Sequence, residues 1–136
     1  MKSPTVHVAK FTISRLLVIG LLSFVALSTS ILRGAQLAFP GAEGFGRFSQ
    51  GGRGGQLRFV TNLNDSGPGS LRAAVEAEGP RIVLFKVSGT IELQSTLRIL
   101  NPHITIAGQS APGDGICLRR FALNISADDA VVRFLR

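Results

Sequence analysis

Short apolar–polar–apolar triplets recur through the second half of the chain and predict a series of very short β-strands. In each triplet two apolar residues share one face and a third residue points the other way, as in a strand with one buried face. Turn residues separate the triplets. The predicted strands span residues 83–87, 91–93, 97–99, 104–106, 116–118, 123–125 and 132–134.

The triplets themselves repeat in groups of three. The third strand after the one at Val83 begins at Ile104, and the third strand after the one at Leu97 begins at Leu123. The other two steps run from position 91 to 116 and from position 104 to 132. Three strands per repeat, at similar steps along the chain, predict the coils of a parallel β-helix, in which stacked coils pair their backbones and share a core.

A β-sandwich of short strands is the competing fold. Its strands would be joined by two-residue hairpin loops of the Asn-Gly or Asp-Gly kind. Asp114-Gly115 is the candidate for such a loop, but it lies in a longer run of turn residues with Pro112 and Gly113. The pattern therefore favours the all-β parallel β-helix.

One short helix is predicted ahead of the first coil. Residues 57–61 alternate as a strand, and the run 62–69 is rich in turn residues. Ser70 is a suitable N-cap for a helix over residues 71–78, which Gly79 and Pro80 end. We expect this N-terminal helix to cap the first coil, because an uncovered coil edge would recruit other strands.

A glycine-rich stretch, residues 39–55, precedes these elements. No helix pattern follows it, so it does not predict a phosphate-binding loop, and a single GGRGG pentad is weak support for RNA binding. We expect a close-packed irregular leader whose glycines permit unusual backbone angles. Phe39, Phe45 and Phe48 are expected to anchor it to the core.

The first thirty residues have the pattern of a secretory signal peptide. A basic region up to Arg15 precedes an apolar run over residues 16–27, and the small residues Ser28, Thr29 and Ser30 follow. Cleavage is expected between about Ser28 and Ala38. The alternative is an uncleaved anchor, since extending the run to Leu32 nearly reaches bilayer length. Both alternatives export the rest of the chain, to a secreted or periplasmic location with membrane contact only through this segment.

Charge and cysteine content narrow the choice of partners. Lys2, Lys10 and Arg15 lie in the targeting segment, which leaves 12 of the 15 basic residues against all 8 acidic ones, an excess of about four positive charges. That excess is compatible with an acidic polymer. The basic residues are scattered, so they predict no nucleic-acid site. Cys117 is the single cysteine and is expected to be a small buried apolar residue.

Several blocks of the exported part resemble secreted bacterial pectate lyase-like proteins. They are AFPGAEGFG at 38–46, GGRGG at 51–55, VTNLNDSGPGSLR at 60–72, VSGTI at 87–91 and ITIAGQSAPGDGI at 104–116. The third block also resembles a capping motif of many β-helix proteins, including surface adhesins. The first and last blocks look closer to polysaccharide lyases. The similarity covers residues 38–136, the expected folded domain.

The resemblance implies a right-handed parallel β-helix that cleaves pectate, a polygalacturonate, by calcium-dependent β-elimination, acting as a monomer. In similar proteins the acidic calcium ligands and the basic catalytic residues lie in later coils. We therefore place no catalytic residue in this chain and expect those residues beyond Arg136. Because the sequence stops within a predicted strand, we expect a truncated product or an incomplete sequence that is inactive and folds poorly alone.

The remaining candidates for chemistry are few. Asp128 and Asp129 are adjacent carboxylates, but neighbours on a strand point to opposite faces, so a shared metal is disfavoured and a solvated turn is expected. Asp114 is expected to form a turn, and His103 to be an isolated loop histidine. Asn124 begins a glycosylation sequon within a predicted strand. Four arginines could line a groove for an acidic polymer, although surface charge is favoured: Arg119, Arg120, Arg133 and Arg136.

Two other functions remain open at this point. A non-catalytic surface or cell-wall β-helix protein would carry the same capping motif and need no catalytic group. An inactive gene fragment would account for an ending within a strand. Carboxylates and a basic residue on later coils would distinguish the lyase from both.

Overall fold

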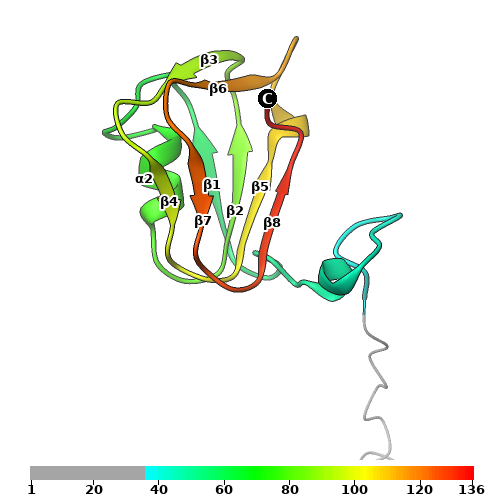
Figure 1. Cartoon of the computed structure of the whole chain (residues 1–136). Coiled ribbons are helices and arrows are strands. Elements are labelled where there is room, and N and C mark those ends of the chain that lie inside the picture. Colours follow the sequence, from blue (N-terminus) through cyan, green and yellow to red (C-terminus); the bar gives the residue numbers. More distant parts are fainter. Residues whose placement is uncertain (1–35) are drawn as a thin grey trace, which may run out of the picture. The chain divides into compact units, whose positions relative to one another are not determined.

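The structure is a computed structural model that describes residues 36–136, which lie within one compact unit (Figure 1). The predicted signal peptide, residues 1–30, lies outside the described residues. Within the described part, no helix has the length and apolar character needed to span a bilayer.

Eight short strands and one α-helix are joined by turns and loops in the described chain. The α-helix is α2 (Leu71–Glu76), and two 3-10 turns are η1 (Phe45–Phe48) and η2 (Gly108–Ser110). The strands are β1 (Gln56–Val60), β2 (Arg81–Phe85), β3 (Gly89–Glu92), β4 (Leu97–Ile99), β5 (Ile104–Ala107), β6 (Ile116–Arg119), β7 (Leu123–Ile125) and β8 (Ala130–Arg133).

All strand pairs are parallel, and from β2 onward each sheet collects every third strand. One sheet has the order β1-β2-β5-β8, a second pairs β3 with β6, and a third pairs β4 with β7. The chain therefore runs through one coil from β2 to β4 and a second from β5 to β7, and it begins a third at β8 (Figure 1). This arrangement agrees with the predicted all-β parallel β-helix. Its right hand stays a prediction.

The register corrects two of the predicted steps in the first sheet. Ile104 pairs with Arg81 rather than with Val83, and it pairs with Ala130 rather than with Val132. The first step is thus longer than predicted and the second is shorter. Both errors have one cause, because the inward row of these strands begins with a charged residue in β2 and with alanine in β8. A search for apolar residues therefore places the start of each of these strands two positions too late.

Inward apolar side chains of successive coils stack into one core. Along the first sheet, Val83 pairs with Ile106, which in turn pairs with Val132. In the third sheet, Leu97 and Ile99 are fully buried and stack on the next coil at Leu123 and Ile125. Neither coil could bury these residues alone, so the core exists only as a stack.

The predicted helix is present but ends two positions earlier, at Glu76. The Ser70 side chain caps its first turn by accepting a hydrogen bond from the Ala73 N–H at 3.2 Å. Leu71, Ala74 and Val75 are buried, and the helix contacts β1, β2 and β4. Its role as a cap on the coils stays a prediction.

The leader is irregular, as predicted, but two of its three phenylalanines do not anchor it. Phe45 is fully exposed and Phe48 is 43% exposed. The Phe39 ring instead lies against the Arg133 guanidinium, 4.0 Å from the ring centroid. Gly51, Gly52 and Gly55 also approach the coils so closely that an added side chain would collide with them.

Candidate functional site

A buried arginine forms the most connected polar group of the described residues. Arg81 begins β2 on the inward face and is completely inaccessible to solvent. Its guanidinium donates hydrogen bonds of 2.6 to 3.3 Å to five backbone carbonyls, those of Ala74, Val75, Gly79, Asn101 and Pro102. Within residues 36–136 no carboxylate lies within ion-pair distance of Arg81. Burial lowers the pKa of Arg81, yet the side chain keeps its charge because arginine begins from a very high pKa.

The five carbonyls show what this arginine does. Ala74 and Val75 lie in the last turn of α2, where carbonyls have no partner within the helix. Asn101 and Pro102 precede β5 at the start of the second coil. Arg81 therefore ties the end of α2 to two successive coils, which is a structural rather than a catalytic arrangement.

A second arginine joins the start of α2 to the first coil. Arg72 pairs with Asp65 through two hydrogen bonds, Nη2 to Oδ1 at 2.7 Å and Nε to Oδ2 at 3.3 Å. The same guanidinium donates to the carbonyls of Ser95 and Thr96, just before β4. The hydrogen bond from Arg72 is the main reason that the pKa of Asp65 lies below its ordinary value. This carboxylate is occupied and is not a free metal ligand.

Asp129 is not the solvated turn residue that the sequence predicts. Its Oδ1 accepts hydrogen bonds from the N–H groups of Gln50 at 2.7 Å and Gly51 at 3.2 Å. Its Oδ2 lies 2.8 Å from Nδ1 of His103, so His103 is not isolated either. Burial alone raises the pKa of Asp129, but the hydrogen bonds from His103, Gly51 and Gln50 outweigh burial and leave the pKa lowered.

The sequence contains a signal for this pair that motif reasoning missed. The step from His103 to Asp129 equals the step from Leu97 to Leu123, so the two residues occupy one position in successive coils. Both have a left-handed backbone, with φ of 57° and 56°. The pair is a stacked turn position that also fastens the leader.

The described carboxylates do not fit a calcium site. Calcium prefers six to eight oxygen ligands, including several carboxylates. Residues 36–136 contain no cluster of three or more His, Cys, Asp or Glu side chains suited to a metal ion. Asp129 already receives three donors, and Asp128 contributes its carbonyl to the His103 N–H, as part of the stacked turn. No step of a metal-dependent reaction can be assigned to these residues.

The four arginines proposed for an acidic polymer have different surroundings. Arg119 and Arg120 both approach Glu92, at 3.5 and 3.7 Å, on exposed side chains where such pairs contribute little. Arg133 lies between the rings of Phe39 and Phe134, 4.0 and 4.9 Å from their centroids. The Arg136 guanidinium contacts the Asp114 carbonyl, in the turn before β6. Each of the four arginines thus has a local partner among the described residues.

The remaining candidates lie on the surface of the second coil. Asn124 is exposed on β7, and its Oδ1 accepts a hydrogen bond from the Ser126 hydroxyl at 3.0 Å. Cys117 is half-buried on β6 rather than buried, in line with Thr90 of the coil before it. The described geometry thus supports stacking and carries no reactive constellation.

Parallel coils with this turn chemistry define the β-helix class of proteins, and comparison with known proteins narrows the class. No family model matches the chain. Over 119 residues it is 50% identical to a protein of Aspergillus terreus named probable pectate lyase C, a match that covers 87% of this chain and 27% of the relative. A probable pectate lyase C of Emericella nidulans is 54% identical over 103 residues, covering 75% of this chain and 24% of that protein.

A plant protein extends the range of relatives. The probable pectate lyase 12 of Arabidopsis thaliana is 35% identical over 91 residues, covering 60% of this chain and 19% of that protein. Over the matched segments, the chain is thus similar to proteins named as probable pectate lyases. These relatives are fungal and plant proteins. They do not support the expected similarity to bacterial proteins in particular. The chain spans about a quarter of the length of the fungal relatives it matches.

Proposed function

We propose that this chain is the part of an exported pectate lyase that begins its β-helix. The observation that carries the proposal is the 50% identity over 119 residues to the Aspergillus terreus protein. The parallel coils and the excess of basic residues in the exported part are consistent with binding an anionic polysaccharide. The substrate that this proposal assigns to the whole protein is pectate, and the protein is expected to act as a monomer outside the cytoplasm.

The reaction class is β-elimination. A base removes the proton on the carbon beside the uronate carboxylate, and the neighbouring glycosidic carbon–oxygen bond breaks. The leaving oxygen gains a proton, and the new sugar end carries a carbon–carbon double bond. None of the groups in residues 36–136 combines a free base with a carboxylate-binding partner, so we assign this step to residues beyond Arg136. We also propose that the whole protein requires calcium, held by residues of that later part.

Joining the chain to the remainder of a relative tests the proposal. The full chain is fused at Arg136 to the part of the Aspergillus terreus protein that follows its matching segment. The fused protein is expected to convert polygalacturonate to unsaturated products, measured by their ultraviolet absorbance. Chelation should abolish this activity and added calcium should restore it, while the chain alone should release none.

The unmodified Aspergillus terreus protein serves as the control for the assay. A fusion that unfolds cooperatively but leaves polygalacturonate intact, while the control cleaves it, would count against the assignment. Cleavage that continues in the presence of a chelator would remove calcium from the proposal. Activity of the chain alone would show that its catalytic groups lie within residues 36–136.

A further inference from the structure

The outward side chains of the third sheet stay exposed where one coil stacks on the next. β4 and β7 lie side by side in this sheet, and Arg98 pairs with Asn124 (Figure 1). The flanking Leu97 and Ile99 are fully buried, so the alternation of a strand turns Arg98 and Asn124 outward. Both outward residues are exposed. Because Arg98 remains exposed with β7 paired beside it, the exposure of Asn124 follows from its place on the strand.

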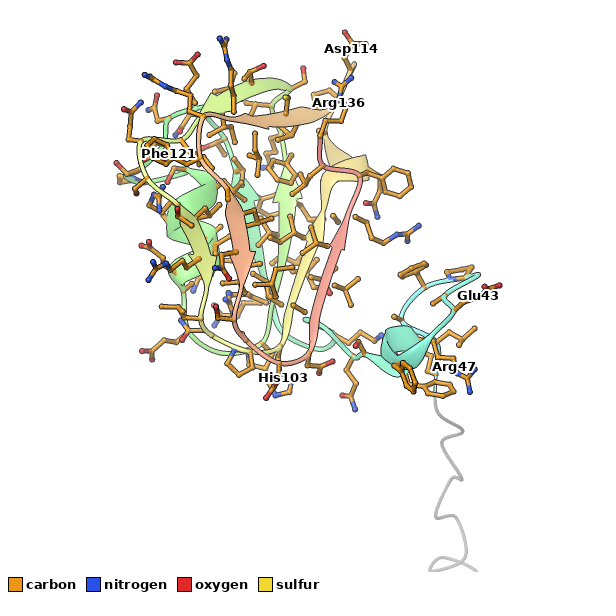
Figure 2. The ribbon with its side chains drawn as sticks, in the orientation of Figure 1. Glu43, Arg47, His103, Asp114, Phe121 and Arg136 are labelled. Carbon is orange, nitrogen blue, oxygen red and sulfur yellow. The ribbon has the colours of Figure 1, made fainter. Side chains whose placement is uncertain are left out.

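The Asn124 side chain uses only one of its two polar atoms. Its Oδ1 accepts a hydrogen bond from the Ser126 hydroxyl at 3.0 Å, and the Ser126 N–H donates to the Ile99 carbonyl of β4 at 3.0 Å. Among the described residues, the Nδ2 amide of Asn124 has no hydrogen-bond partner. In Figure 2 this strand follows the labelled Phe121, which is also exposed. An exposed asparagine with a free amide, two positions before a serine, is suited to N-linked glycosylation.

A second triplet of this kind lies in the turn before α2. Asn64-Asp65-Ser66 has an acid in its middle position. Before folding, that negative charge lies next to the acceptor amide and repels an anionic donor. In the folded protein Asp65 is bound to Arg72 at 2.7 Å, which ties this turn to α2. The middle residue of the other triplet is Ile125, which carries no charge, so Asn124 is the better acceptor.

We propose that Asn124 is the acceptor of an N-linked glycan, attached while the chain is exported. This proposal rests on the proposed function only for that export. The relatives from Aspergillus terreus and Arabidopsis thaliana come from organisms whose secretory pathway attaches glycans to the Asn-x-Ser pattern. The co-reactant is an oligosaccharide whose first sugar is joined to a lipid diphosphate.

The transfer exchanges one bond of the first sugar for another. The Asn124 Nδ2 forms a bond to the anomeric carbon, and the bond from this carbon to the diphosphate oxygen breaks. The lipid diphosphate leaves with the electron pair, and the amide nitrogen gives one proton to a base of the transferring enzyme. The attached glycan then lies on the outward face of the third sheet beside Arg98, so the inward core needs no repacking.

Peptide mapping of the exported protein tests the proposal. The fusion of the full chain to the Aspergillus terreus remainder is produced in an Aspergillus host. Trypsin yields the peptide 121–133, in which Asn124 is the one asparagine, and the peptide 59–72, which contains Asn64. A glycan-releasing amidase in water labelled with heavy oxygen converts each glycosylated asparagine to a labelled aspartate. We expect this label at Asn124 in most of the molecules.

Three substitutions separate the acceptor from its surroundings. Ser126→Ala keeps Asn124 but should lower its occupancy at least about tenfold, because the acceptor pattern requires the hydroxyl. Ser126→Thr keeps the hydroxyl and should keep the glycan. Asn64→Gln is the matched control and should leave the occupancy of Asn124 unchanged.

An Asn-Gly-Thr triplet in a flexible tail added to the fusion reports entry into the secretory pathway. An unmodified Asn124 beside a glycosylated tail would overturn the proposal and leave the lyase function intact. An unmodified tail would overturn both the export and the glycan. A glycan at Asn124 in a fusion that leaves polygalacturonate intact would support the site and reject the function. Because the transfer precedes folding, fusion protein retained in the host membranes is mapped in the same way.

Discussion

The two ends of the coil stack differ in which backbone groups are hydrogen-bonded and which apolar side chains are exposed. At the first end, the carbonyls that end α2 receive hydrogen bonds from side chains of the coils. Arg81 serves Ala74 and Val75, and the Asn101 amide serves Glu76 and Ala77 at 2.9 and 3.2 Å. At the last end, β8 keeps an open backbone edge beside exposed phenylalanines. The hydrogen bonds thus satisfy the end of α2, while β1 and β8 both remain edge strands of the described sheet.

Different interactions therefore stabilise the first end of the stack and the leader. The first end depends on buried hydrogen bonds, which are costly to remove because the partners left behind stay buried. The leader, which runs along the first sheet, depends on close backbone approach and on one carboxylate. Substitutions should therefore have large effects at the first end and smaller, more specific effects at the leader.

Replacing Arg81 should produce the largest loss. Arg81→Met keeps much of the side-chain length but leaves five buried carbonyls without their donor. We expect the free energy of unfolding to fall by about 3–5 kcal/mol, measured by urea denaturation of the fusion to the Aspergillus terreus remainder. Arg98→Met on the outward face of β4 is the matched control and should change stability by less than about 0.5 kcal/mol. An Arg81→Met protein as stable as the control would show that these hydrogen bonds do not stabilise the first end.

A methyl group added at Gly52, in the glycine-rich leader, should weaken the packing of the leader to an intermediate degree. In Gly52→Ala the added carbon collides with the Arg81 carbonyl, a backbone group that cannot move aside without disturbing β2. Overpacking of this kind costs about 1–3 kcal/mol. The control is Gly46→Ala, where the nearest atom to the added carbon is Ser49 Oγ at 3.8 Å. Thermal unfolding should separate the two variants, and equal melting temperatures would show that the leader is not packed on the coils.

The smallest expected effect is dependent on pH. Asn tolerates the left-handed backbone of Asp129, so Asp129→Asn changes mainly the charge. Because the pKa of Asp129 is lowered in the folded state, its carboxylate stabilises the fold above the unfolded pKa of about 3.9. That contribution is lost as the pH falls through the folded pKa.

We therefore expect the variant to be less stable by about 1 kcal/mol near neutral pH. The difference from the wild type should shrink below about pH 4. Urea denaturation of both proteins over this range measures the difference, and Asp65 affects the two proteins equally. A difference that grows toward acid pH would contradict the lowered pKa.

Local sequence patterns predict the strands. They do not predict the burial of residues whose contacts depend on how the coils stack. The bounds of β4 and β7 match the predicted triplets because both inward positions are apolar. Arg81 was missed as an inward residue because its burial depends on carbonyls of α2 and of the next coil, which no local pattern reveals. Phe45 and Phe48 were misassigned to the core because their surroundings depend on where the leader runs across the coils.

The candidate site was predictable to a smaller extent. The expectation that catalytic and metal residues lie beyond Arg136 stays a prediction, as does the signal peptide. Asp129 was assigned to solvent because its partners, at positions 50, 51 and 103, are distant in sequence. A search for polar residues that repeat at the step between coils would have paired it with His103. In a coil stack, polar turn residues that repeat at the coil step therefore indicate contacts, as repeated core residues do.

The hydrogen bond between Gln50 and Asp129 also sets a delay during synthesis. The two residues are 79 positions apart. At ribosomal rates of roughly 5–20 residues per second, Gln50 of the glycine-rich leader is made roughly 4–16 seconds before its carboxylate partner. During the first part of that interval, before β2 and β5 are made, the leader has no strand to lie against. Its many glycines give it little tendency to form aggregating strands of its own, so the composition that permits close packing in the finished protein also protects the nascent chain while it waits.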